Sequence, residues 1–190
     1  MVNTLEPYSN WEELCGKGRI IPAFPGAGGG FENGVLKAAL TPRIIQPTTF
    51  SEISETKTER IGALSKIFGK SKIPYQIVAD MHRWQLCHLA MVVPIADAYY
   101  NANNPQKVWE EHKIMLETAK QMKSNFKTIH NLGLSLSPRK MNIFRLVPVP
   151  VLKAGLIITF KSNFGNVFMY QHSMNAPDEM RELHRQFYKY

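Results

Sequence analysis

The hydrophobic pattern along the chain changes near residue 55. Before that point, short apolar runs alternate with glycine and proline, which is typical of short strands joined by turns. The strand-like runs are 19–24, 34–40, 43–45 and 48–53, and 11–15 is predicted to form a short helix. Strands so few and so short do not close a sheet that buries both of its faces. We therefore expect residues 1–55 to be part of an α/β domain that begins upstream of Met1.

From residue 56 onwards the pattern becomes helical. Thr56 and Glu59 have the spacing of a capping box, in which a hydroxyl and a carboxylate each accept a hydrogen bond from a free amide. Gly69 is predicted to end this helix in the left-handed conformation. A second helix is expected over 79–101. Because it is apolar nearly all round from 86 to 95, we expect it to be the central helix of its domain, kinked at Pro94.

A third helix is expected between Asn104-Pro105 and Gly133, and it carries a regular apolar seam. Positions seven residues apart are Val108, Met115, Met122 and Ile129, with His112, Ala119 and Phe126 between them. This spacing predicts packing against another helix, either within the chain or across a dimer. His112 is then expected in a core or an interface. Further helices are predicted after Pro138, over 149–160 and after Pro177, so that residues 56–190 form an all-α domain.

Charge is concentrated in one part of the chain. Lysine and arginine number 23 against 15 acidic residues, which gives a net charge of +8. No Asp or Glu occurs from Thr118 to Pro177, where the cations are Lys120, Lys123, Lys127, Arg139, Lys140, Arg145, Lys153 and Lys161. The first three alternate with the apolar seam, and no recognition motif accompanies them, so a solvated helix face is favoured and no nucleic-acid partner is expected. The alternative is a small anionic partner, such as a cofactor phosphate or an acid substrate.

Cysteine content and hydropathy exclude several classes of protein. Cys15 and Cys87 are too few for a disulfide framework or a four-cysteine zinc site, and they fit a reducing cytoplasm. The uncharged apolar runs are shorter than the roughly 18 residues of a membrane-spanning helix. No signal peptide is predicted, and the histidines show no metal-binding spacing. We expect a cytoplasmic location, no metal and no membrane partner.

A glycine-rich segment at 25–31 follows a strand-like run, as a dinucleotide-binding loop would. In the pattern G-x-G-x-x-G, however, the third glycine is replaced by Phe31, and Glu32-Asn33-Gly34 is a turn rather than a helix start. Glu52 stands at about the distance of the acidic residue that binds the ribose in dinucleotide-binding folds, but the glycine pattern itself is incomplete. We predict a glycine hairpin or loop at this place, not a cofactor site.

Several segments, taken in order along the chain, resemble the ketopantoate reductase (2-dehydropantoate 2-reductase) family. They are Val2-Asn3-Thr4, Ala23-Phe24-Pro25-Gly26-Ala27-Gly28-Gly29, Phe50-Ser51-Glu52-Ile53, Asp80-Met81-His82-Arg83-Trp84, Val93-Pro94-Ile95, Ser162-Asn163-Phe164, and His172-Ser173-Met174-Asn175-Ala176 running into Asp178-Glu179-Met180. The resemblance in order and texture extends over essentially all 190 residues and is to a divergent branch.

The resemblance implies an oxidoreductase in which a Rossmann domain binds NADPH and a 2-keto acid is reduced in the cleft beside a helical domain. Residues 1–55 would be a remnant of the NADP-binding domain, with an incomplete Rossmann-type sheet. Residues 56–190 would be the helical C-terminal domain, similar to that of 6-phosphogluconate dehydrogenase, which binds substrate and dimerises. The family's G-x-G-x-x-G and first strands would lie before Met1.

The resemblance also implies which residues of this chain occupy the positions of the family's site residues. Asn3 matches the family's cleft asparagine and is implied to bind the cofactor. Aligned on Pro94, the place of the family's catalytic lysine is occupied by Gln85. The places of two asparagines on the same helix are occupied by Leu89 and Val93. This chain therefore lacks three side chains of the family's reaction centre.

Other residues are candidates to replace them. His88, one turn along from Gln85, is the candidate catalytic proton donor, and the alternative is a buried histidine with a purely structural role. A late acidic residue of the family falls within 172–175, where no carboxylate occurs. The resemblance implies Ser162, His172 and Asn175 as substrate-binding residues in that part of the chain.

Two hypotheses of different classes follow. The first is that the chain is the later part of an NADPH-dependent reductase of a 2-keto acid, which binds a small anionic substrate and is inactive as residues 1–190 alone because the phosphate-binding helix start is missing. The second is a non-catalytic helical dimerisation or binding module, favoured by the missing lysine and the apolar seam. A homodimer through the helical domain is expected, and a monomer at micromolar concentration, with normal NADPH turnover in the intact protein, would contradict the second hypothesis.

Overall fold

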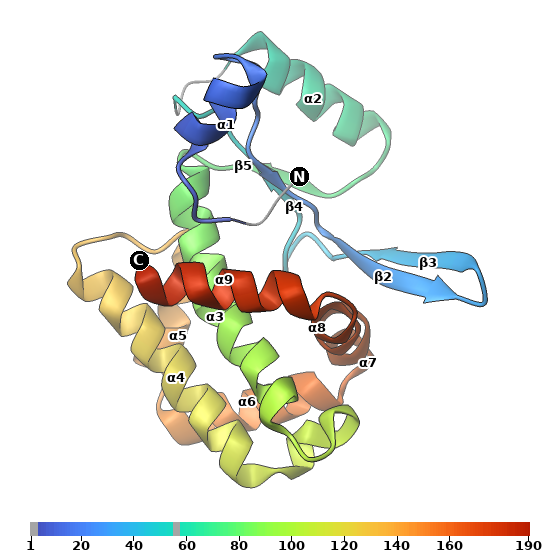
Figure 1. The fold of residues 1–190 in the computed structure, drawn as a ribbon, viewed down its shortest axis with the longest axis vertical. Coiled ribbons are helices and arrows are strands. Elements are labelled where there is room, and N and C mark those ends of the chain that lie inside the picture. Colours follow the sequence, from blue (N-terminus) through green and yellow to red (C-terminus); the bar gives the residue numbers. More distant parts are fainter. Residues whose placement is uncertain (1–3, 55–57) are drawn as a thin grey trace. The chain divides into compact units, whose positions relative to one another are not determined.

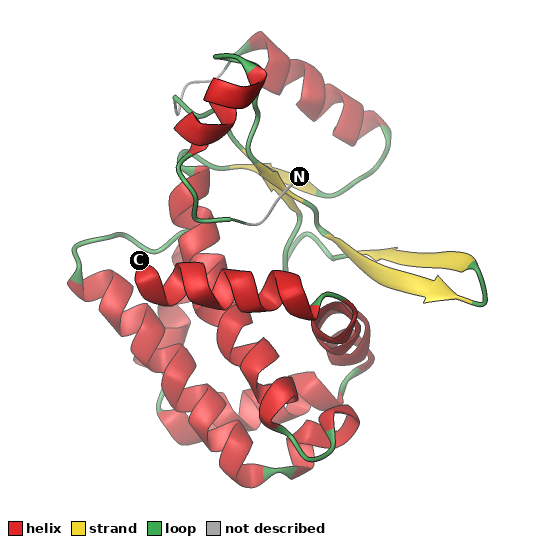
Figure 2. Ribbon diagram, viewed as in Figure 1, coloured by secondary structure: helices red, strands yellow, loops and turns green. Residues whose placement is uncertain are grey.

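The computed structural model describes residues 4–54 and 58–190 (Figures 1 and 2). Contacts divide the chain into two compact units, and the division falls between Gln85 and Leu86, inside helix α3 (Met81–Asn101). This boundary lies later than the change of pattern near residue 55. The reason is strand β5 (Tyr75–Ile77), which pairs with β4 (Thr48–Phe50) and so belongs to the first unit. Asn3 and Thr56 lie outside the described residues.

The first unit combines short helices with two small sheets. Its remaining elements are α1 (Tyr8–Cys15), β1 (Ala23–Phe24), β2 (Ala27–Glu32), β3 (Val35–Leu40) and α2 (Glu59–Lys70). One sheet has the order β1-β4-β5, in which β4 is antiparallel to β1 and parallel to β5. Since α2 connects the two parallel strands, β4, α2 and β5 form a βαβ unit. The expected α/β character is therefore present.

Helix α2 packs on the three-stranded sheet through the face that carries Ile61, Leu64 and Phe68, whose spacing of three and four residues is that of an amphipathic helix. Ile61 and Phe50 are buried together, with Phe68 and Tyr75 packed against them. The ring of Phe50 stacks 5.6 Å from that of Phe68 and 5.9 Å from that of Tyr75, measured between centroids. Thr58 caps α2 by accepting a hydrogen bond from the backbone amide of Ile61. This aromatic cluster is the core of the first unit.

The glycine-rich segment forms a β-hairpin, as predicted. Strands β2 and β3 are antiparallel and in register from Ala27↔Leu40 to Glu32↔Val35. The turn is Asn33-Gly34, with φ of 50° and 77°, which is the conformation that tight hairpin turns require. At Gly29 a Cβ atom would lie 2.0 Å from the carbonyl oxygen of Lys37, so only glycine fits the close approach of the two strands. These glycines serve the hairpin rather than a phosphate.

Three expectations for the first 80 residues are wrong. Residues 43–45 form a turn instead of a strand, because the amides of Ile45 and Gln46 both donate to the carbonyl of Pro42. Gly69 lies inside α2, and the left-handed residue after the helix is Lys72, with φ of 54°. The part after residue 55 is not all-helical, since it contains β5.

The second unit is helical in its described residues. After α3 come η1 (Pro105–Glu110), α4 (His112–Asn131), η2 (Arg139–Met141), α5 (Asn142–Leu146), α6 (Val149–Lys161), α7 (Asn163–Gly165), the π-helix η3 (Asn166–Tyr170), α8 (Gln171–Asn175) and α9 (Pro177–Lys189). Figure 2 shows helices joined by short loops in this part of the chain. Gly133 ends the α4 segment with φ of 81°, as its sequence predicts.

The apolar seam packs inside the unit. Its buried members are Val108, Met115, Ala119, Met122, Phe126 and Ile129. Helix α4 packs against α5 and α6, and the ring of Phe126 stacks 5.0 Å from that of Phe144. The intramolecular alternative is therefore confirmed, and the seam is not available as a dimer interface. His112 is exposed rather than buried, because Glu111, with ψ of 80°, breaks the helix and leaves His112 at the first turn of α4.

None of the described helices is both long and apolar enough to cross a membrane by itself. One pair reaches that length and composition only when taken together, Arg139–Leu146 and Val149–Lys161, and this pair is bent by 119°.

Candidate functional site

The part of α3 that resembles the family's catalytic helix is almost completely buried. Gln85, which occupies the place of the lysine, is 1% exposed, and Cys87 and Leu89 are fully enclosed. A buried amide requires hydrogen-bonding partners, since it loses its contact with water. The Tyr8 hydroxyl of α1 supplies one by donating a hydrogen bond to Oε1 of Gln85. Both residues belong to the first unit, and Gln85 is the residue that the resemblance aligns with the family's lysine.

The Tyr8 hydroxyl is held in its protonated form. Burial, followed by the negative charge of Asp80, raises the pKa of Tyr8 well above its ordinary value. The Tyr8 ring also meets the edge of the His82 ring, with centroids 6.0 Å apart. Nε2 of His82 lies 3.2 Å from the carbonyl oxygen of Leu5. These contacts fasten α1 to the start of α3 and fix the position of the phenol.

His88, the predicted proton donor, is 4% exposed. Burial, with a smaller contribution from His172, lowers its pKa to about 3. At neutral pH the ring is therefore uncharged and has no imidazolium proton to transfer. A neutral imidazole still offers one N–H as a hydrogen-bond donor to a carbonyl oxygen, which is a different chemical role.

Helix α8 brings two of the predicted substrate-binding residues together. His172 and Asn175 are both exposed, and their spacing of three places them on neighbouring parts of one helical turn. Ser173 between them is buried, and its carbonyl accepts a hydrogen bond of 2.6 Å from the Tyr100 hydroxyl. His172 is near enough to His88 to influence its pKa. The second unit thus groups His88, His172 and Asn175.

Ser162 has a local structural task at the junction of α6 and α7. Its hydroxyl donates to the carbonyl of Thr159 at 2.6 Å and accepts from the amide of Gly165 at 3.1 Å. A Cβ at Gly165 would lie 2.2 Å from the same Thr159 carbonyl oxygen, so the turn is tightly packed. The Ser162 hydroxyl is thereby committed to shaping this turn.

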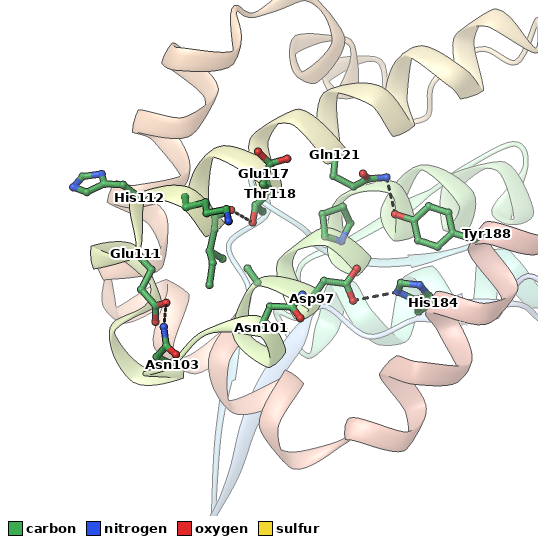
Figure 3. Close-up of a pocket in the computed structure, with 14 residues that line it drawn as sticks. Asp97, Asn101, Asn103, Glu111, His112, Glu117, Thr118, Gln121, His184 and Tyr188 are labelled. Atoms are coloured by element: carbon green, nitrogen blue, oxygen red, sulfur yellow. Dashed lines mark hydrogen bonds and ion pairs between the residues drawn. The ribbon is translucent and has the colours of Figure 1, made fainter.

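A depression of about 810 Å³ lies elsewhere in the second unit, between the end of α3, the start of α4 and α9 (Figure 3). Asp97 lies 3.1 Å from Nδ1 of His184, and Gln121 donates a hydrogen bond of 2.9 Å to the Tyr188 hydroxyl. Burial raises the pKa of Asp97, and His184 opposes that shift. Figure 3 shows His112 directed away from the other labelled side chains. The cavity combines a carboxylate, an imidazole and a phenol.

Among the described residues, His88, Ser162, His172 and Asn175 do not line this cavity. Neither the Tyr8–Gln85 pair nor the Asp97–His184 pair was found from the sequence. Their partners stand 77 and 87 positions apart, and no motif or spacing links residues at such separations. Within the described ranges 4–54 and 58–190, no three His, Cys, Asp or Glu side chains are arranged to hold a metal ion.

The chain was also compared with known proteins. Neither protein-family models, nor curated proteins, nor solved structures give a match to it.

Proposed function

We propose that the chain is the later part of an NADPH-dependent reductase of a 2-keto acid, similar to the ketopantoate reductases, in which Tyr8 replaces the family's lysine as the acid. The proposal rests on the ordered resemblance along the chain. The observation that carries it further is the hydrogen bond from the Tyr8 hydroxyl to Gln85. A phenolic O–H is thus bonded to the residue that the resemblance aligns with the family's proton-donating amine.

The chemistry of the two side chains favours Tyr8 over its neighbours. The Gln85 amide has no proton to give at neutral pH, but it can orient a phenol. The raised pKa of Tyr8 keeps the phenol protonated at neutral pH but makes it a weaker acid than an ordinary phenol, so its proton would have to turn from Gln85 to an oxygen that gains strong negative charge as a ketone is reduced. Tyr8 is only half-buried, whereas His88 is enclosed and uncharged at neutral pH. His88, His172 and Asn175 remain candidates for holding the substrate through hydrogen bonds.

The fold of the first unit is compatible with this proposal. A parallel βαβ unit, here β4, α2 and β5, is the element from which dinucleotide-binding sheets are built. The described residues do not, however, form a glycine-rich turn that leads into a helix, because the glycine-rich segment is the β2–β3 hairpin. How the nucleotide phosphates are held is therefore not assigned to these residues. NADPH would supply the hydride and its electron pair, and Tyr8 the proton, so that the ketone becomes a 2-hydroxy acid.

The experiment measures 2-keto-acid-dependent oxidation of NADPH by the protein encoded by the whole reading frame. Tyr8→Phe is expected to lower kcat by on the order of 10²-fold or more with little change in KM, because only the proton-donating step is lost. Tyr188→Phe, which removes a phenol at the unrelated cavity, is the matched control and should retain its rate. A Tyr8→Phe protein that folds and keeps full kcat refutes the role of Tyr8.

Two further measurements address the reductase itself. Residues 1–190 alone are expected to bind NADPH weakly in a fluorescence titration, and tight binding would contradict that expectation. In-frame DNA upstream of the Met1 codon should encode a strand, a G-x-G-x-x-G turn and a helix. If it does not, and no 2-keto acid supports NADPH oxidation, the reductase proposal is wrong.

A further inference from the structure

The cavity between α3, α4 and α9 lies wholly within the second unit, and the proposed reductase does not use it. Its volume of about 810 Å³ is within the range of small-molecule sites. Helix α9 contributes His184 and Tyr188, which are four residues apart and therefore lie on one face of the helix. Their ring centroids are 4.7 Å apart, so one small molecule in the cavity can contact both side chains.

Asp97 gives His184 the arrangement of a general base. Oδ1 of Asp97 lies 3.1 Å from Nδ1 of His184, and Figure 3 shows the two side chains pointing toward each other. This contact assigns the proton of the neutral ring to Nδ1, where the carboxylate accepts it, and the lone pair to Nε2. Because the His184 side chain is 45% exposed and lines the cavity, this lone pair is accessible to a bound molecule.

The Tyr188 hydroxyl has the arrangement of a matching acid. It accepts a hydrogen bond of 2.9 Å from Nε2 of Gln121, and a phenol that accepts in this way retains its own O–H for donation. Burial raises the pKa of Tyr188, and its hydrogen bonds with Asn125 and Gln121 oppose that shift. These amides therefore stabilise the negative oxygen that remains when the phenol gives up its proton.

The residues that line the cavity favour proton transfer over acyl transfer. Among the described residues, the lining includes no serine or cysteine, and the Thr118 hydroxyl donates to the carbonyl of Ile114 at 2.9 Å. Acyl transfer through a covalent intermediate needs a free nucleophile beside the base. Abstraction of a proton next to a carbonyl needs only a base for the C–H group and an acid for the oxygen.

The charges of the lining favour an uncharged substrate. Residues 86–190, all of them described, carry 13 lysines and arginines against 7 acidic residues, yet the described lining has three carboxylates and one lysine. The carboxylates are Asp97, Glu111 and Glu117, and Glu117 is paired with Lys120 at 2.8 Å. The other two still outnumber Lys113, the lysine of the lining, so a substrate with a carboxylate of its own is repelled.

We infer that this cavity is a proton-transfer site that enolises a small uncharged ketone or aldehyde, with His184 as the base and Tyr188 as the acid. Nε2 of His184 takes a proton from the carbon next to the carbonyl, and the electron pair of that C–H bond forms the C=C bond of the enol. The carbonyl oxygen takes the phenolic proton of Tyr188 as its double bond becomes single. Reversal of both transfers returns the carbonyl compound, so no oxidant or reductant is consumed. Asp97 is a positioning residue, because it acts through the ring of His184.

The first test is deuterium exchange into hydroxyacetone in D₂O, followed by ¹H NMR, with the 190-residue chain. The wild type is expected to exchange the C–H groups beside the carbonyl on the order of 10²-fold faster than an equal concentration of free imidazole, which is the gain of a positioned acid or base. Pyruvate, which carries a carboxylate, should gain much less. The reductase assay is independent of this exchange, since the exchange needs no NADPH.

Two variants and a matched control assign the exchange to the cavity. His184→Gln and Tyr188→Phe should each remove most of the acceleration, and circular dichroism checks that both proteins fold. Tyr188→Phe is at the same time expected to retain the reductase rate. His130→Gln removes an exposed histidine at the end of α4, outside the cavity, and should leave the exchange unchanged.

A spectroscopic measurement tests the role of Asp97. Long-range ¹⁵N–¹H NMR of the wild type should show His184 protonated at Nδ1, and Asp97→Ala should lose both this preference and most of the acceleration. Asp178→Ala, at an exposed acid of α9, should change neither. A wild type no faster than imidazole overturns the inference, and so does a folded His184→Gln or Tyr188→Phe protein that keeps the full rate. Equal acceleration of pyruvate overturns the assignment of an uncharged substrate.

Discussion

The Tyr8 hydroxyl donates its hydrogen bond to Oε1 of Gln85, 77 positions further along the chain. Gln85 is enclosed, and Tyr8 is half-buried beside it, so the bond joins a short N-terminal helix to the first turns of α3. This relationship bears on the proposed reductase function. There, the glutamine that the resemblance aligns with the family's lysine would position a phenol as the proton donor.

Removal of the Tyr8 hydroxyl should also lower stability. Tyr8→Phe is expected to reduce the free energy of unfolding by about 1–2 kcal/mol, since the buried Gln85 oxygen loses a donor. Denaturant unfolding measures this difference. In a double-mutant cycle, Gln85→Met should abolish most of the effect of Tyr8→Phe. Strictly additive losses would show that the two side chains do not interact in solution.

Buried Glu52 and partly exposed Arg60 form an ion pair that should stabilise the first unit in a pH-dependent way. Nε of Arg60 donates to Glu52 at 2.8 Å, and Thr58 donates to the same carboxylate. The hydrogen bond from Arg60 lowers the pKa of Glu52 in the folded state. Because a lowered carboxyl pKa favours the folded state only while the group is ionised, this stabilisation is present above the unfolded pKa, near 4.3, and is lost as pH falls through the folded value.

The corresponding variant is Glu52→Gln. We expect it to reduce the free energy of unfolding by about 2–3 kcal/mol at pH 7 and by less in acid, where the wild type has lost the same charge. Unfolding curves recorded from neutral pH down to about pH 3 compare the two proteins. Equal losses at all pH values would contradict the role given to the ionised carboxylate. The ion pair with Arg60 also gives Glu52 a structural role that does not require it to bind the ribose of a cofactor.

Local patterns along the chain predicted a large part of the fold. The face of α2 that carries Ile61 follows from helical spacing, and the turn at Asn33-Gly34 follows from the backbone freedom of these two residues. The apolar seam of α4 was predicted, although its partner could be identified only from the structure. Short elements such as β5 were missed, because three residues carry too little periodicity and the strand exists through its pairing with β4.

The candidate sites depended on information that a sequence pattern does not contain. The burial that lowers the pKa of His88 comes from surrounding helices, so its charge state could not be deduced from its place in an apolar run. Tyr8 stands in an unremarkable polar stretch, and its partner is far along the chain. His112 was expected in a core or an interface because the seam extends through it, but the break at Glu111 leaves it exposed.

Asp97 and His184 provide a prediction with the opposite sign of pH dependence. Burial raises the pKa of Asp97 in the folded state, so ionisation of this carboxyl favours unfolding. The loss of stability caused by ionising Asp97 is absent below the unfolded pKa, near 3.9, and develops fully as pH rises through the folded pKa. Asp97→Asn keeps an oxygen that can accept from His184 and removes the charge. We expect stability at pH 8 to rise by roughly 1 kcal/mol or less, as measured by thermal unfolding. A lower stability of the variant at pH 8 would show that the ion pair outweighs the burial of the charge.

Two glycine-to-alanine substitutions should act in opposite directions, because only one of the two glycines is required by packing. Gly62 lies in α2, where a Cβ would meet no atom within 4 Å. Gly62→Ala is therefore expected to stabilise the protein by about 0.5–1 kcal/mol through the lower entropy of the unfolded chain.

A Cβ at Gly165 would lie 2.2 Å from the Thr159 oxygen and 2.9 Å from Cα of Phe160. Because these are backbone atoms that cannot move aside, Gly165→Ala should cost about 2 kcal/mol or more and disturb the Ser162 turn. Chemical denaturation of both variants measures the difference, and a neutral Gly165→Ala would show that the α6–α7 junction is looser than its contacts imply.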